Sequence, residues 1–337
     1  MPGPRPSRRH MLAAGAALLV IGPTGCTRSI QLAPEGADPL EAPSRRAETD
    51  SALAQAVALM AALTAVHVTV RTGPQTPPAL ATAARALAAD RMTHAITLHA
   101  ELRRVRPAPA PSAATPPAAP PLTDPDLAGA RAALIQAVHA AQDEAIHLVL
   151  TLPGYRAALL ASVAACCATH LALHDKETYR GHQTPFGRDM SPYRAQSVDA
   201  VQGALAAEHA AVWAYGLAGA FVPDESAGML EEAATAHQAR RDATERALID
   251  AGARPVPAEP GYLSPEPVTD AASALRLMIT AETDAAAAWR SVVERSPAEP
   301  GLRAAALDAL IGASVWATRW RATADIVPLT VPFPGVP

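Results

Sequence analysis

The stretch that decides the fold is residues 204–215, which read A-L-A-A-E-H-A-A-V-W-A-Y. Apolar residues recur every three or four positions around Glu208, so a helix places this carboxylate on one apolar face with Leu205 and Tyr215. A carboxylate on such a face is costly unless another group neutralises it. The sequence therefore predicts a buried partner for Glu208 elsewhere in the chain.

Composition favours an all-α protein. The chain has 337 residues, which is enough for two ordinary domains. Half of the residues are hydrophobic although only 4% are aromatic, because alanine supplies the difference. Alanine is the best helix former, and the 33 prolines fall mostly in blocks between the alanine-rich runs. A net charge of −4 and the lack of a basic stripe with interleaved aromatics predict no nucleic-acid partner.

Residues 1–26 are expected to be an export signal. Ser7 to Leu12 read S-R-R-H-M-L, which resembles the core of a twin-arginine signal, a type that exports folded proteins. The apolar run 12–21 is too short to span a membrane as a mature helix. Cys26 then follows a small residue, as at a lipoprotein processing site, although Pro23 departs from that pattern. We expect lipid on Cys26 and a place on the extracytoplasmic face of the cell membrane; the alternative is a cleavable signal with a chance cysteine.

The rest of the chain is expected to form two four-helix bundles. The predicted parts are a flexible tether over 27–44, an N-terminal helical bundle over 45–179, a linker over 180–196, a second bundle over 197–326 and a Pro-rich tail over 327–337. Helices are predicted over 44–71, 78–106, 126–152 and 155–179 in the first bundle, and over 197–221, 225–251, 269–295 and 302–324 in the second.

Each half has short first and third connections and a long Pro-rich middle loop. An extended chain covers about 3.3 Å per residue. A helix of about 26 residues is roughly 39 Å long, so the middle loop can run the length of a bundle. This is the connectivity of ferritin-like bundles and not that of plain up-down bundles.

A polar layer is predicted halfway along the second bundle. Four side chains fall near helix midpoints on inward-facing stripes: Glu208, His237, Arg241 and Glu282. Arg241 lies one helical turn after His237, where it could reach between the two carboxylates. A guanidinium keeps its charge and has five donors, so it can neutralise both acids. We therefore expect a buried Glu/His/Arg network at this level.

The alternative for this layer is a metal site. Ferritin-like metal centres take a glutamate from each of two helices and Glu-x-x-His from each of the other two. Here Ala234 replaces the glutamate that would accompany His237, and the helix over 302–324 lacks both motif residues. No cofactor is therefore predicted. Iron or another transition metal on Glu208, His237 and Glu282 is kept as an alternative, as is a small-ligand pocket at the same level.

Several short motifs in the second half resemble a known family. They are A-A-E-H-A-A-V-W-A-Y-G at 206–216, H-Q-A-R-R-D at 237–242, the P-G-Y run within 255–263, A-E-T at 281–283 with Trp289, and A-x-x-W-A-T-R-W-R at 313–321. Together they resemble the ferritin-like domain of unknown function found in bacterial envelope lipoproteins, over about residues 197–326. The resemblance implies the fold and the envelope setting. It implies no activity and does not extend to the first half.

The first half contains two adjacent cysteines and most of the histidines. Neighbouring residues on a helix point about 100° apart, so Cys166 and Cys167 are predicted to be small core residues and not a disulfide. His94, His139 and His170 fall near helix midpoints, and Glu144 and His147 form a Glu-x-x-His motif. These residues are either a second metal layer or ordinary core and surface histidines.

Two functions follow from these patterns. The first is a non-catalytic envelope protein, held to the membrane by its lipid anchor, which binds a protein or a small ligand. The second is a metal-binding protein or metal-dependent oxidoreductase of the ferritin-like type, with a di-iron or mononuclear centre on Glu208, His237 and Glu282.

Overall fold

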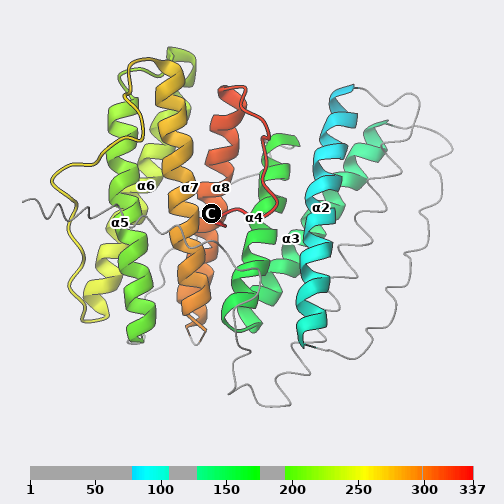
Figure 1. The fold of residues 1–337 in the computed structure, drawn as a ribbon, viewed down its shortest axis with the longest axis horizontal. Coiled ribbons are helices and arrows are strands. Elements are labelled where there is room, and N and C mark those ends of the chain that lie inside the picture. The colour runs from blue at the N-terminus through cyan, green and yellow to red at the C-terminus, as the bar shows by residue number, and fades with distance from the viewer. Residues whose placement is uncertain (1–77, 106–126, 175–193, 298, 337) are drawn as a thin grey trace, which may run out of the picture.

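A computed structural model describes residues 78–105, 127–174, 194–297 and 299–336, and these residues form helices and loops without any strand (Figure 1). The all-α prediction is therefore confirmed for this part of the chain. The predicted export signal, the predicted lipidation site Cys26, the predicted tether, the first predicted helix over 44–71 and most of the predicted linker lie outside the described residues.

Seven α-helices occupy the described ranges, close to the predicted positions. They are α2 (Pro78–Val105), α3 (Leu127–Thr151), α4 (Gly154–His174), α5 (Ala195–Ala218), α6 (Ala227–Asp250), α7 (Ala271–Arg295) and α8 (Pro300–Thr323), with a short 3-10 turn at Asp224–Ser226 before α6.

Local chemistry explains where two of these helices begin. At the start of α7, Asp270 accepts a hydrogen bond from the backbone N–H of Ser273 at 2.8 Å, and the Ser273 hydroxyl accepts one from the Asp270 N–H at 3.1 Å. This capping box satisfies two donors that the first turn leaves unpaired. Pro300 is the first residue of α8, and the backbone N–H that proline lacks would have no partner within the helix at this position.

Helices α5 to α8 form one bundle. Helix α5 packs against α6 and α7, and α7 packs against α8. The connection between α6 and α7, residues 251–270, runs along the outside of this bundle (Figure 1). A connection that spans the bundle allows α6 and α7 to point in the same direction along it.

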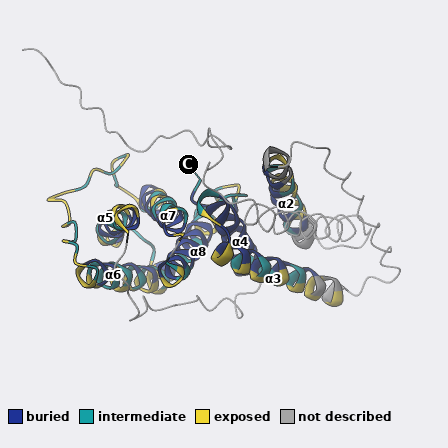
Figure 2. Ribbon diagram, turned by 90° about the horizontal axis from the view of Figure 1, so that it is seen from below, coloured by how far each residue is buried: buried dark blue, intermediate teal, exposed yellow. Residues whose placement is uncertain are grey.

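Helix α4 joins the two halves. It packs against α3 on one side and against α7 and α8 on the other (Figure 2). Every residue over 156–172 is buried. In the described part of the chain α4 is also the one helix that is long and apolar enough to cross a membrane, and 89% of that apolar window is buried inside the protein. The two halves share a continuous core that includes Leu87, Val138, Leu160, Trp289 and Leu307.

The chain after α8 packs back against the helices. Ser162 of α4 donates a hydrogen bond to the carbonyl of Pro334 at 2.8 Å, and the Phe333 ring lies 4.9 Å from the His94 ring of α2. Gly335 has φ +76°, and a Cβ there would lie 2.7 Å from the carbonyl oxygen of Ala286 on α7. Only glycine fits this position without strain. The predicted Pro-rich tail is thus a packed segment that contacts both halves.

Candidate functional site

The C-terminal bundle brings two acids and one histidine together at its centre. Glu208 comes from α5, His237 from α6 and Glu282 from α7, and each of these residues is 0% exposed. The structure therefore places three of the four predicted layer residues side by side. Each sits on the apolar stripe that the helical period of its own segment predicted.

The His237 ring bridges the two carboxylates. Its Nδ1 lies 2.7 Å from Oε2 of Glu208, and its Nε2 lies 3.0 Å from Oε1 of Glu282. Carboxylate oxygens only accept hydrogen bonds, so both ring nitrogens donate. An imidazole that donates from both nitrogens carries a positive charge.

The second oxygen of Glu208 has two further donors. Arg240 Nη1 lies 3.0 Å from Oε1 of Glu208, and Trp289 Nε1 donates to the same oxygen at 2.6 Å. Both oxygens of this fully buried carboxylate are therefore hydrogen-bonded, which offsets the cost of removing it from water.

Aromatic residues complete the surroundings of Glu282. The Tyr215 hydroxyl donates to Oε1 of Glu282 and accepts a hydrogen bond from Trp320 Nε1 at 2.6 Å. The other oxygen of Glu282, Oε2, is buried and has no hydrogen-bond partner within the described residues. We call the whole group the imidazole network. Its members, drawn from all four helices, are Glu208, His237, Glu282, Arg240, Trp289, Tyr215 and Trp320.

The pKa values of the network follow from burial and from its opposite charges. Burial opposes the charged form of His237, but the Glu282 and Glu208 carboxylates prevail and raise its pKa to about 9. Burial also opposes the charged form of Glu208, but Arg240 and His237 lower the pKa of that carboxyl to about 2. Burial and the Glu282 carboxylate raise the pKa of Tyr215 well above its ordinary value, so the phenol remains a donor. The charges of Glu208, His237 and Arg240 therefore stabilise one another within the core.

The prediction that Arg241 belongs to this layer is wrong. Its guanidinium bonds Oδ1 of the neighbouring Asp242 at 2.8 and 2.7 Å, and its side chain is 28% exposed. Arg240 takes the inward position instead, opposite Gly312 of α8, where a Cβ would lie 3.3 Å from Arg240 Nη2. Residues three and four positions after His237 both lie beside it on a helix, so spacing alone could not separate the two arginines.

The network does not fit the metal pair of ferritin-like proteins. Both nitrogens of His237 face carboxylates, so a metal would have to displace one of those hydrogen bonds to gain an imidazole ligand. The α6 position that would supply a further carboxylate is Ala234, and the Arg240 guanidinium lies against Glu208. Two carboxylates and one engaged imidazole are too few ligands for two metal ions.

A second polar cluster lies in the N-terminal half, between α2 and α4. Oδ2 of Asp90 lies 2.8 Å from His170 Nε2, 3.7 Å from Cys166 Sγ and 2.8 Å from the Thr330 hydroxyl. One ligand atom each from Asp90, Cys166 and His170 lies within 4.8 Å of the other two, and all three residues are buried. This donor set could hold a metal ion.

Arg91 and His94 border this cluster. Arg91 Nη2 donates to Cys167 Sγ at 3.0 Å, and its Nη1 lies 3.2 Å from His94 Nδ1. His94 Nε2 donates to the carbonyl of Pro332. Burial and the Arg91 charge lower the pKa of His94 to about 3, so that ring is neutral. The C-terminal segment therefore closes over the cluster through Thr330 and Pro332.

The predicted histidine layer is only partly assembled. His94 and His170 lie at this cluster, but His139 is half-buried elsewhere and His147 is exposed. Cys166 and Cys167 are buried free thiols, as expected. Sequence reasoning missed Asp90 and the part that Cys166 plays. The available signal was Asp-x-x-x-His on α2 and Cys-x-x-x-His on α4, two pairs that each share one helix face.

Comparison with known proteins supplies a family for the second half. Residues 200–337 match the family described as "Domain of unknown function (DUF4439)". A solved structure described as a conserved hypothetical protein, rv2844, from Mycobacterium tuberculosis is 35% identical in sequence. That match covers 39% of this chain and 98% of the solved one, with a TM-score of 0.37. No match was found among curated proteins.

Proposed function

We propose that this chain, whose C-terminal half matches a domain of unknown function, is an exported, lipid-anchored and non-catalytic protein of the cell envelope. In this proposal the C-terminal bundle is ferritin-like, and the imidazole network stands where related bundles hold metal. One observation carries the proposal: both nitrogens of His237 are used by carboxylates, at 2.7 and 3.0 Å. The network holds the four helices in register and leaves no vacant imidazole ligand.

The ferritin-like part of the proposal is supported by the connection over residues 251–270, which runs along the bundle. It is supported also by a buried polar layer to which all four helices contribute. The envelope setting rests on the sequence alone, through the twin-arginine motif at 7–12 and the cysteine at position 26. Lipid on Cys26 would make the membrane the first partner of this protein.

Metal analysis of the natively exported, full-length protein tests the proposal. We expect the imidazole network to hold less than one iron, manganese or zinc ion per chain. A matched pair of variants, Glu208→Gln and Asp90→Asn, assigns any metal that is found. Stoichiometric metal that is lost in Glu208→Gln and kept in Asp90→Asn would overturn the proposal.

A second candidate function is metal binding at the N-terminal cluster. The observation that favours it is the convergence of Asp90, Cys166 and His170, whose ligand atoms lie within 4.8 Å of one another. Carboxylate, thiolate and imidazole are the ligands that zinc prefers, and a structural site needs four. The Thr330 hydroxyl, 2.8 Å from Asp90, or a water molecule would be the fourth.

Cobalt substitution separates this candidate from the first. Cobalt bound through Cys166 gives a thiolate charge-transfer absorption, which Cys166→Ser should abolish. Cys167→Ser is the matched control, because the sulfur of Cys167 contacts Arg91 and not Asp90. An absorption that survives Cys166→Ser, or that is absent in the unchanged protein, rules out this site.

A further inference from the structure

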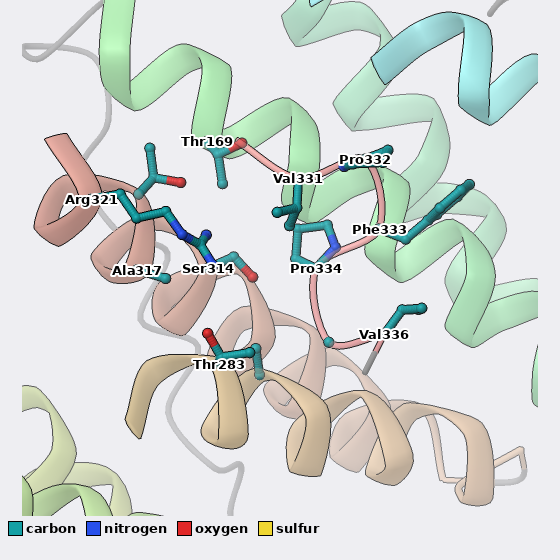
Figure 3. A pocket seen from close by; sticks show the side chains of 13 residues that line it. Thr169, Thr283, Ser314, Ala317, Arg321, Val331, Pro332, Phe333, Pro334 and Val336 are labelled. Atoms are coloured by element: carbon teal, nitrogen blue, oxygen red, sulfur yellow. The ribbon is translucent and has the colours of Figure 1, made fainter. Parts of the chain in front are cut away.

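A cavity of about 280 Å³ lies where α4, α7 and α8 meet the C-terminal segment (Figure 3). Its polar lining comes from the helices, and the segment 331–336 supplies an apolar wall that includes Val331 and Phe333. No residue of the imidazole network lines it. A ligand bound in this cavity would therefore act separately from the imidazole network and from the proposed function.

The cavity contains a guanidinium that has no counter-ion among the described residues. Arg321, in the last turn of α8, lines the cavity and extends toward Ser314 (Figure 3). The guanidinium of Arg321 makes no hydrogen bond or ion pair with any other described residue. Arg319, two positions earlier on the same helix, instead stacks on the Trp316 ring at 4.7 Å. A half-buried guanidinium keeps its charge, so the cavity favours an anion with a planar pair of oxygens.

Three of the four hydroxyl groups in the lining are placed to accept hydrogen bonds, and the fourth is that of Thr318. Thr169 donates its proton to the carbonyl of Cys166 at 2.7 Å, Thr283 to that of Ile279 at 2.7 Å, and Ser314 to that of Leu310 at 2.6 Å. Each proton is used within its own helix, so the oxygen lone pairs remain for a ligand. A group that binds beside them must donate hydrogen bonds.

The charge of the lining favours a neutral hydroxyl over an ammonium group as the hydrogen-bond donor of the ligand. None of the described residues that line the cavity is acidic, and Arg321 is positively charged. An ammonium group would therefore meet an uncompensated like charge, whereas a neutral hydroxyl would not. The volume lies just below the usual range for ligand pockets, about 300–1,000 Å³, which indicates a small molecule.

From these observations we propose that the cavity binds a small hydroxylated carboxylate, of the hydroxy-acid or sugar-acid class. Its carboxylate pairs with the Arg321 guanidinium. Its hydroxyls donate to the oxygens of Thr283, Ser314 and Thr169, and its carbon skeleton lies on the wall formed by the C-terminal segment.

Ligand-observed NMR titration of the full-length protein tests this assignment with three probes. Gluconate has both the carboxylate and the hydroxyls, hexanoate has only the carboxylate, and glucitol has only the hydroxyls. We expect gluconate to bind most tightly and glucitol not to bind. Arg321→Gln should weaken gluconate binding by about tenfold or more, since a charged hydrogen-bonded pair is lost. The matched control Arg319→Gln, on the same turn but outside the cavity, should bind as the unchanged protein does.

A double variant, Thr283→Val with Ser314→Ala, tests the hydroxyl acceptors without touching the charge. It should weaken gluconate binding and leave hexanoate binding unchanged. The assignment is overturned if gluconate fails to bind, if hexanoate binds as tightly as gluconate, or if Arg319→Gln weakens binding as much as Arg321→Gln. Circular dichroism of each variant checks that it folds. If Arg321→Gln does not fold, the double variant decides the proposal.

Discussion

Nδ1 of His237 lies 2.7 Å from Oε2 of Glu208, and both side chains are fully buried. An ion pair at this depth stabilises a protein only when its remaining polar atoms are also satisfied. Here Arg240 and Trp289 satisfy the other oxygen of Glu208. Removal of one charged member therefore leaves an uncompensated charge in the core. Single substitutions in the network should lower the free energy of unfolding for this reason.

The first prediction concerns His237 itself. His237→Gln keeps a similar volume but removes the positive charge between Glu208 and Glu282. We expect the free energy of unfolding to fall by about 3–5 kcal/mol, the usual cost of breaking a buried ion pair. Urea denaturation measures it. His147→Gln, at an exposed position of α3, is the control and should change the value by less than about 0.5 kcal/mol.

The second prediction concerns alkaline pH. The pKa of His237 is raised from 6.5 in the unfolded chain to about 9 in the folded one. The folded state therefore holds this proton more tightly, so the stabilisation is complete below about pH 6.5 and is lost as pH rises through 9. By linkage the loss is about 3 kcal/mol. Denaturation curves between pH 6 and pH 10 should show this slope in the unchanged protein and not in His237→Gln.

The third prediction separates the two adjacent arginines of α6. Arg240→Met should lower the free energy of unfolding by about 2–4 kcal/mol, because it leaves the buried Glu208 carboxylate without a guanidinium. Arg241→Met should change it by less than about 1 kcal/mol, because its pair with Asp242 is partly exposed. The reverse order of the two losses would show that Arg241 and not Arg240 serves the network.

The fourth prediction concerns the C-terminal segment. Gly335→Ala adds a Cβ at φ +76°, 2.7 Å from the Ala286 carbonyl oxygen, so the segment must move away from α7. We expect a loss of about 2 kcal/mol or more and faster proteolysis of this segment. Gly261→Ala is the control, because nothing lies within 4 Å of its added Cβ. Equal proteolysis of the two variants would contradict the packing described for Gly335.

The fifth prediction concerns the proposed anchor. Cys26→Ser should move the exported protein from the membrane fraction to the soluble envelope fraction, because the residue that carries the lipid is lost. Lysine at both Arg8 and Arg9 should instead leave the protein inside the cell. Cell fractionation with an antibody measures both. Membrane association that survives Cys26→Ser would mean that lipid on this cysteine is not the anchor.

Helix positions and inward faces could be predicted from the sequence by itself. Apolar residues at intervals of three and four identify the buried face of a helix without reference to its neighbours. That period placed Glu208, His237 and Glu282 in one layer. The proline-rich segments also fell between helices, as the sequence predicted.

Only the tertiary structure decided which side chains meet. Arg240 and Arg241 both lie beside His237 on α6. Arg240 takes the inward position because Gly312 of α8, which has no side chain, leaves space opposite it. Asp90 and His170 are 80 positions apart in the chain, and Thr330 reaches Asp90 from a segment 240 positions away. Periodicity describes one helix at a time. Contacts between helices depend on how each is rotated and on the rotamers that the neighbouring surface allows, so they follow only from the packed fold.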